Sequence, residues 1–277
     1  MTAIFALVPD EPRFDRVWPA VTILVALWSW ESLRPLWPGR KSRLRHGLRN
    51  LAMSAINAIV LFFTLGLLTA MLAAWTVENS VGILHRLDLP TVWRVALGFL
   101  VLDLWTYWWH RANHRVPFLW RFHRTHHSDA EMDCTTSARF HIGELTMAGL
   151  LRLPLIAAFG LDPLTIVVHE TVLLAVSQFH HSNVGLGRWD RFVRILIVTP
   201  ALHQVHHSRR VRETNSNYAS VLSVWDRIGR SFTHPDRVPP IELGLDQFDD
   251  PDWQTLGGML RTPSASNAPP DVAKVPE

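Results

Sequence analysis

The chain has 277 residues, of which 48% are hydrophobic and only 18% are charged. Soluble proteins carry about 25% charged residues, so this composition favours a protein with a large apolar surface. The 27 basic residues barely outnumber the 24 acidic ones and cluster beside apolar segments, which argues against nucleic-acid binding. The single cysteine, Cys134, excludes an internal disulfide and a cysteine-based zinc site.

Apolar runs at membrane scale predict the architecture. They lie at roughly 18–37, 51–75, 92–109, 145–160 and 163–179. The second run has the ~20 residues needed to cross a bilayer. The last two runs form a hairpin around a Gly-Leu-Asp-Pro turn, and a shorter run at 192–202 is expected at the interface or against the core. The mixed charge of the first residues does not predict a cleavable signal peptide.

No stretch shows the sustained alternation of a half-buried strand. We therefore expect an all-α fold: an integral membrane helical bundle of about 3–5 spanning or re-entrant helices, with a cytosolic helical cap that carries the histidines. A soluble helical core is the alternative, because Asp103, Glu144 and His169 interrupt the apolar runs.

The basic residues between the first two apolar runs orient the bundle. They are Arg40, Lys41, Arg43, Arg45 and Arg49. Short basic loops of this kind stay on the cytoplasmic side. Alternating the spans from there brings every histidine cluster to the cytoplasmic side of a bacterial-type inner membrane or its equivalent.

Three parts follow along the chain. Residues 1–91 hold the N-terminal helices and the basic loop, and we expect 92–238 to form the domain that carries the histidine clusters. The polar tail 239–277, rich in proline, serine and asparagine near its end, is expected to be disordered and dispensable.

The positions of the histidines are the most informative feature. The chain has 15 of them, and eight fall in three tight clusters: His110 with His114, His123 with His126 and His127, and His203 with His206 and His207. A further pair, His180-His181, precedes Ser182-Asn183. Spacings of three and four residues put side chains on one face of a helix. So many imidazoles exceed the needs of one metal ion, and the pattern predicts two.

Adjacent histidines on one helix point about 100° apart, so each His-His pair can serve two different ions. Ligand type alone does not choose the metal, since imidazole suits iron, zinc, copper and nickel. Two other membrane classes remain as alternatives. A metal transporter or metal-binding membrane protein would place its ligands near the bilayer midplane, and a bis-histidine haem cytochrome would place them on facing spans.

Several motifs together resemble the fatty acid hydroxylase superfamily, also called the sterol desaturase family. Besides the histidine clusters, they are Arg139-Phe-His-Ile-Gly-Glu144, Phe179-His-His-Ser-Asn183, Thr199-Pro-Ala-Leu-His-Gln-Val-His-His-Ser208, Asn215-Ser-Asn-Tyr218 and Leu222-Ser-Val-Trp-Asp-Arg227. The resemblance covers roughly residues 95–235.

The resemblance implies a membrane-bound, O2-dependent oxidoreductase with two iron ions (Fe2+/Fe3+), which hydroxylates or desaturates a C–H position of a lipid such as a sterol or fatty acyl chain. By position it implies nine iron ligands: His110, His114, His123, His126, His127, His181, His203, His206 and His207. His180 is a weaker candidate, and His141 could be a ligand or a hydrogen-bond partner of one.

Orienting partners for the imidazoles are expected among Asp129, Asp133, Glu144, Asn113 and Asn183. The chain shows no cysteine cluster for iron–sulfur, no flavin fingerprint and no haem-domain segment. We therefore expect a separate electron donor, such as a ferredoxin, a cytochrome b5-like protein or a reductase.

Overall fold

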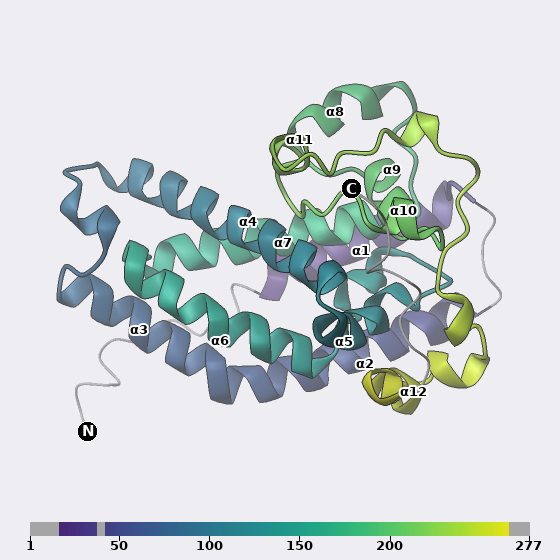
Figure 1. The fold of residues 1–277 in the computed structure, drawn as a ribbon, viewed down its shortest axis with the longest axis horizontal. Coiled ribbons are helices and arrows are strands. Elements are labelled where there is room, and N and C mark those ends of the chain that lie inside the picture. The colour runs from purple at the N-terminus through teal and green to yellow at the C-terminus, as the bar shows by residue number, and fades with distance from the viewer. Residues whose placement is uncertain (1–16, 38–41, 266–277) are drawn as a thin grey trace.

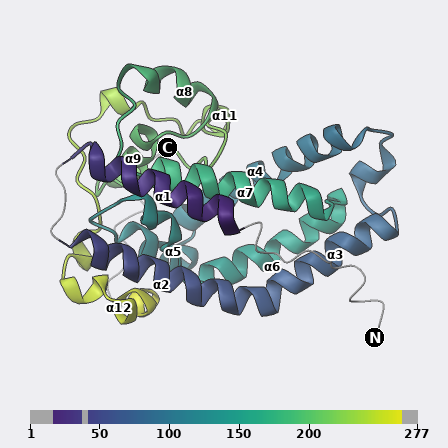
Figure 2. The ribbon, with the colours of Figure 1, turned by 180° about the vertical axis from the view of Figure 1, so that it is seen from behind.

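The computed structural model describes residues 17–37 and 42–265, and these residues build an all-α protein, as predicted (Figure 1). Within them there is no strand, only two isolated bridges, Ile197 with Leu222 and Ser208 with Leu243. Long helices run side by side along the long axis, and short helices form a cap at one end, as both ribbon views show (Figure 2).

The bundle matches the predicted apolar runs. Its helices are α1 (Val17–Leu33), α2 (Arg43–Leu61), the π-helical turn η2 (Phe62–Gly66), α3 (Leu67–Glu78), η3 (Ile83–Arg86), α4 (Thr91–Arg115), α6 (Ile142–Phe159) and α7 (Pro163–His181). The predicted run 51–75 lies inside the continuous segment α2–η2–α3, and α6 and α7 form the predicted hairpin.

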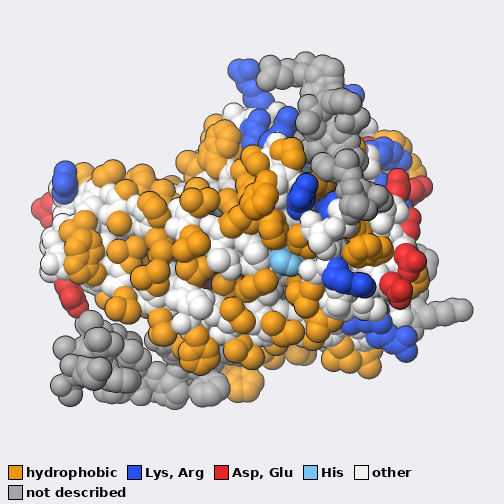
Figure 3. Space-filling view, turned by 60° about the horizontal axis from the view of Figure 1, so that its bottom comes forward, with side chains coloured by type: hydrophobic (Ala, Val, Ile, Leu, Met, Phe, Trp, Pro, Cys, Tyr) orange, Lys and Arg blue, Asp and Glu red, His pale blue; other side chains and the backbone are white. Residues whose placement is uncertain are grey.

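The exterior of the bundle is apolar. Two helical segments in the described part of the chain are long and apolar enough to cross a bilayer, Arg43–Arg86 and Ile142–Phe159. Only 11% of the most apolar window of each is buried. Figure 3 shows hydrophobic side chains over the narrow bundle, while charged side chains gather mainly at the wide end. An apolar surface of this extent requires a membrane rather than water around it.

Local signals set the turns at the end of the bundle away from the cap. Gly160 ends α6 in the left-handed region at φ 68°, and the Asp162 side chain accepts a hydrogen bond from Thr165 N at 2.7 Å to begin α7. Gly82 packs so closely on Gly160 that a Cβ there would lie 2.1 Å from its nitrogen. These contacts hold the α3–α4 connection against the α6–α7 turn.

The cap is built from short helices. They are α5 (Pro117–His127), η4 (Cys134–Ala138), η5 (Gly187–Trp189), α8 (Asp190–Leu196), α9 (Pro200–His206), α10 (Val211–Thr214), α11 (Val224–Ile228), η6 (Pro235–Arg237), η7 (Asp246–Phe248), η8 (Pro251–Gln254), α12 (Leu256–Arg261) and η9 (Thr262–Ser264).

The expected disorder of the tail is wrong for residues 239–265. Phe248 is buried against Trp120, and the buried guanidinium of Arg124 donates to Thr262 O. Gln254 Nε2 donates to Ser128 O at 2.9 Å. The polar composition of this segment did not reveal that a few apolar side chains and backbone carbonyls contact α5. Residues 266–277 lie outside the described part of the chain.

Candidate metal centre

Nine histidines converge at the junction of bundle and cap. They form two groups in which all ligand nitrogens lie within 4.8 Å of one another. The five-histidine group consists of His110, His114, His123, His127 and His206, and the four-histidine group of His126, His181, His203 and His207. These are the nine residues assigned to iron by the resemblance.

Adjacent histidines divide between the groups. His127 belongs to the five-histidine group and its neighbour His126 to the four-histidine group. His206 and His207 divide in the same way on the last turn of α9. One residue of offset turns a helical side chain by about 100°, which is enough to aim it at a second centre. This is the arrangement that the paired histidines predicted.

Distances within each group suit ligands of a common ion. In the four-histidine group the Nε2 atoms of His181 lie 3.0 Å from those of His126 and His203, and His203 lies 3.2 Å from His207. In the other group His110 Nε2 lies 3.1 Å from His123 Nε2. Nitrogens about 2.1 Å from a metal and at right angles to each other would be about 3 Å apart.

Backbone carbonyls fix the orientation of three of these rings. His110 Nδ1 bonds Tyr218 O, His206 Nδ1 bonds Ser216 O and His181 Nδ1 bonds Ser177 O, each at 2.7 Å. A carbonyl accepts only from N–H, so these contacts place the proton on Nδ1 and leave Nε2 with a free lone pair.

A carboxylate orients a fourth ring. Glu144 Oε1 accepts from His123 Nδ1 and from Asn113 Nδ2, both at 2.9 Å, and all three side chains are buried. Such a carboxylate behind an imidazole fixes its tautomer and raises its basicity. Glu144 therefore holds the position expected of an orienting partner, whereas Asn113 bonds this carboxylate rather than an imidazole.

Burial keeps the cluster neutral. It lowers the pKa of His126, His203 and His207 well below the usual 6.5, and the neighbouring imidazoles lower it further. Several ring nitrogens are buried with no hydrogen-bond partner among the described residues, including both of His114 and both of His127. Neutral, unpartnered nitrogens crowded together are the donor set that a metal ion requires.

The two weaker candidates lie outside both groups. The His180 ring packs against His203, with centroids 3.9 Å apart. His141 instead caps α6: its Nδ1 accepts from Gly143 N at 3.0 Å, and its Nε2 lies 3.3 Å from Leu260 O. The sequence did not reveal this capping role, because His141 lies only three residues before Glu144 and the resemblance implies a metal ligand or a partner of one at this position.

The other expected orienting residues bond elsewhere. Asp129 and Asp133 both bond His46, at 2.9 and 3.1 Å, and Asn183 Oδ1 accepts from Trp37 N. The buried His46 was not singled out by its sequence. The signal was present, however, because His46 and Asn50 lie four residues apart on α2 and share its buried face.

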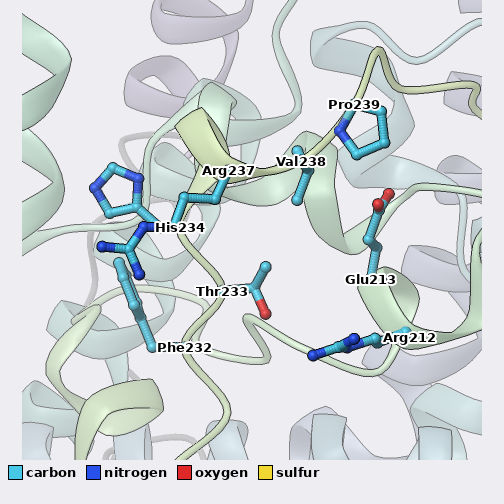
Figure 4. Close-up of a pocket in the computed structure, with 8 residues that line it drawn as sticks. All are labelled: Arg212, Glu213, Phe232, Thr233, His234, Arg237, Val238 and Pro239. Carbon is cyan, nitrogen blue, oxygen red and sulfur yellow. The ribbon is translucent and has the colours of Figure 1, made fainter.

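A separate cavity of about 650 Å³ opens on the cap between α10 and η6 (Figure 4). It is lined by Arg212, Glu213, Phe232, Thr233, His234, Arg237, Val238 and Pro239. None of these residues belongs to the nine-histidine cluster, so the cavity is distinct from the candidate metal centre.

The apolar bundle and the convergent imidazoles define a class: an integral membrane protein whose histidine cluster could hold two metal ions. Residues 95–231 match the fatty acid hydroxylase family. Through this region the chain belongs to the fatty acid hydroxylase superfamily, as the motifs predicted.

Three relatives illustrate the range of the superfamily. The chain is 28% identical over 215 residues to alkylglycerol monooxygenase of Xenopus tropicalis, covering 76% of this chain and 44% of the relative. It is 31% identical over 159 residues to ornithine lipid hydroxylase OlsE of Rhizobium tropici (56% and 46%) and 27% identical over 130 residues to human cholesterol 25-hydroxylase (47% and 47%). The chain thus spans less than half the length of each. No solved structure gives a significant match.

Proposed function

We propose that the protein is a membrane-bound, O2-dependent di-iron oxidoreductase that hydroxylates a C–H position of a lipid. The observation that carries this proposal is the division of nine buried histidines into two groups of five and four. The relatives are named as a monooxygenase and two hydroxylases of lipids, which favours hydroxylation over desaturation.

In this proposal the nine histidines hold two ions. The donor set is imidazole alone, which iron shares with zinc, copper and nickel, and the choice of iron rests on the family. When bound, the iron supplies with O2 the oxidising power that removes hydrogen from an unactivated C–H bond, which side-chain acids and bases cannot do.

The residues of the chain hold and orient the ligands. Glu144 and the carbonyls of Tyr218, Ser216 and Ser177 keep Nδ1 protonated and aim Nε2 at the ions. The surrounding apolar and backbone groups exclude bulk water, since every one of the nine imidazoles is buried. A lipid would reach the cluster laterally, because the cluster lies at the end of the membrane bundle.

The alternative functions fit this arrangement less well. A transport pathway would distribute ligands along the spans, whereas the nine histidines gather at one end of the bundle. A bis-histidine haem would need a porphyrin plane between facing imidazoles. In five of the six pairs within the four-histidine group the ring centroids are only 4.3–5.2 Å apart.

We place the cluster on the cytoplasmic side of a bacterial-type inner membrane. Arg43 and Arg49 lie in the first two turns of α2, at the same end of the bundle as the histidines, where His46 bonds Asp129. A reporter fused after residue 45 should therefore give a cytoplasmic signal, because basic residues remain inside. A periplasmic signal at this position would reverse the proposed orientation.

The electron donor in this proposal is a separate ferredoxin, cytochrome b5-like protein or reductase. The purified chain alone should then fail to turn over with NAD(P)H and should gain activity when a reducing system is supplied. Turnover with NAD(P)H in the absence of any partner would contradict this expectation.

The decisive experiment combines metal analysis with lipid analysis. Protein expressed with ample iron and purified in detergent should contain about two irons per chain, and lipids from expressing cells grown under 18O2 should gain one labelled oxygen. His126→Ala and His207→Ala should lose the metal and the product, while His234→Ala, outside the cluster, should keep both. Iron-loaded protein with no labelled lipid would reject the hydroxylase proposal, and zinc-only protein would reject the metal assignment.

A further inference from the structure

The cap carries an apolar surface that the metal centre does not use. Six large apolar side chains are exposed on η5, α8 and α11. We call the surface that they form the α8–α11 wing; its residues are Trp189, Phe192, Ile195, Leu196, Val224 and Ile228. Ile195, Leu196 and Ile228 are 65–68% exposed. Such a concentration on three short helical elements exceeds what a surface facing water normally shows.

The wing is fixed beside a helix of the bundle. Asp103 Oδ2, in the middle of α4, accepts from Leu222 N at 3.1 Å and from Trp225 Nε1 at 2.7 Å. Arg111, two turns further along α4, donates to Gly229 O at 2.8 Å. These bonds lay α11 along α4, where Trp108 is exposed and its ring lies under the Arg111 guanidinium. Figure 1 shows α8 and α11 together on one side of the cap.

The position along α4 gives the depth of the wing. His110 belongs to the metal cluster and lies seven residues from Asp103, a distance of about 10 Å at 1.5 Å per residue. The start of α11, which Asp103 holds, therefore lies about 10 Å nearer the centre of the bundle than His110. Interfacial helices bury their apolar faces about 5–10 Å into the boundary between headgroups and acyl chains.

Cations accompany the exposed rings. Arg188 lies over the Trp189 ring and Arg191 over Phe192, at 5.4 and 4.6 Å. Neither guanidinium forms an ion pair with a carboxylate of the described residues, whereas Arg194 pairs with Asp190 and Asp236. Arginines beside interfacial aromatic rings meet the phosphates of anionic lipids.

We propose that the α8–α11 wing is inserted into the leaflet beside the metal centre, with Arg188 and Arg191 binding the phosphates of anionic lipids. The wing makes the cap a second membrane anchor, in addition to the helices that cross the membrane. The occupant that the observations favour is the bilayer, because the wing lies along α4 and its arginines have no carboxylate partner in the described chain.

Single-cysteine labelling tests the depth of the wing. Ile195→Cys and Ile228→Cys would each carry an environment-sensitive fluorophore in nanodiscs of phosphatidylcholine and phosphatidylglycerol. The control is Glu242→Cys, an exposed position on the loop between η6 and η7. Wild-type protein, whose one cysteine is buried, measures background labelling. Quenchers attached to the acyl chains should dim the two wing labels and leave the control label bright.

The arginines give a second readout. The blue shift of the label at 195 should increase with the phosphatidylglycerol fraction, and Arg188→Gln with Arg191→Gln should abolish that dependence. Wing labels in nanodiscs that respond to aqueous iodide but not to the lipid quencher would overturn the proposal. Labels shielded from both quenchers in a protein that elutes as a dimer would also overturn it, in favour of a second copy of the chain.

Discussion

Single side chains decide the geometry of the candidate centre. The paired histidines at 126–127 and 206–207 are each neighbours in sequence, yet each pair divides between the two groups. The orientation of four rings, those of His110, His123, His181 and His206, then depends on a hydrogen bond through Nδ1. For His123 the acceptor is Glu144, the one carboxylate that bonds a cluster imidazole among the described residues.

Removing this carboxylate should loosen the metal. Glu144→Ala takes away the acceptor behind His123 and Asn113, and changes of this kind typically cost 10–100-fold in metal affinity. Glu144→Gln keeps an oxygen that can accept from Nδ1 and should lose much less. Metal retained against a graded chelator measures the difference. Wild-type retention in Glu144→Ala would show that the carboxylate does not orient the ligand.

Among the elements, α5 contacts both the histidine cluster and the C-terminal segment. One side of it carries His123, His126 and His127, and another contacts the C-terminal segment that composition alone assigned to disorder. Trp120 connects the two, since its ring packs on His114 and His127 as well as on Phe248. The C-terminal segment therefore packs behind the histidine cluster and supports it.

A truncation tests this support. A chain ending at residue 245 should lose thermal stability and metal, because it removes Phe248 and the acceptors of Arg124, whereas a chain ending at 265 keeps these contacts. Phe248→Ala alone should cost about 3–5 kcal/mol of stability. Thermal unfolding in detergent and metal content measure both effects. An unchanged 1–245 protein would restore the earlier expectation of a dispensable tail.

At the scale of the whole molecule, the buried histidines make the metal-free protein sensitive to acid. Burial lowers the pKa of His126, His127, His203, His206 and His207 well below 6.5 in the folded state. The unfolded chain binds protons near pH 6.5 and the folded chain does not, so acidification favours unfolding.

The stability of the metal-free protein should therefore fall as the pH drops below about 6.5, by up to about 1.4 kcal/mol per pH unit for each such histidine. Thermal unfolding midpoints between pH 7.5 and 5 measure the slope. Replacing His126 and His203 by Gln should make the slope shallower. A midpoint independent of pH would mean that these rings are accessible to protons in the folded chain.

The sequence predicted the fold class and the histidines that converge, because both depend on strong local patterns. Apolar length identified the helices, and spacings of three and four residues identified the faces on which histidines meet. Contacts between distant segments left weaker signals. His46 pairs with Asp129 and Asp133 across more than 80 residues, and Arg124 bonds a carbonyl of Thr262. Every residue carries a backbone carbonyl, so no sequence motif could indicate which carbonyl accepts this hydrogen bond.

The interleaving of the two groups on α5 and α9 has a consequence for how the protein fills with metal. An ion bound by His127 and His206 fixes the same two helices that carry His126 and His207 for the other ion. Binding of the first ion would therefore supply much of the conformational free energy needed to order α5 and α9 for the second ion. Metal loading should then be cooperative. In a cell short of iron, the population would then divide into fully loaded and empty molecules, with few half-loaded ones between them.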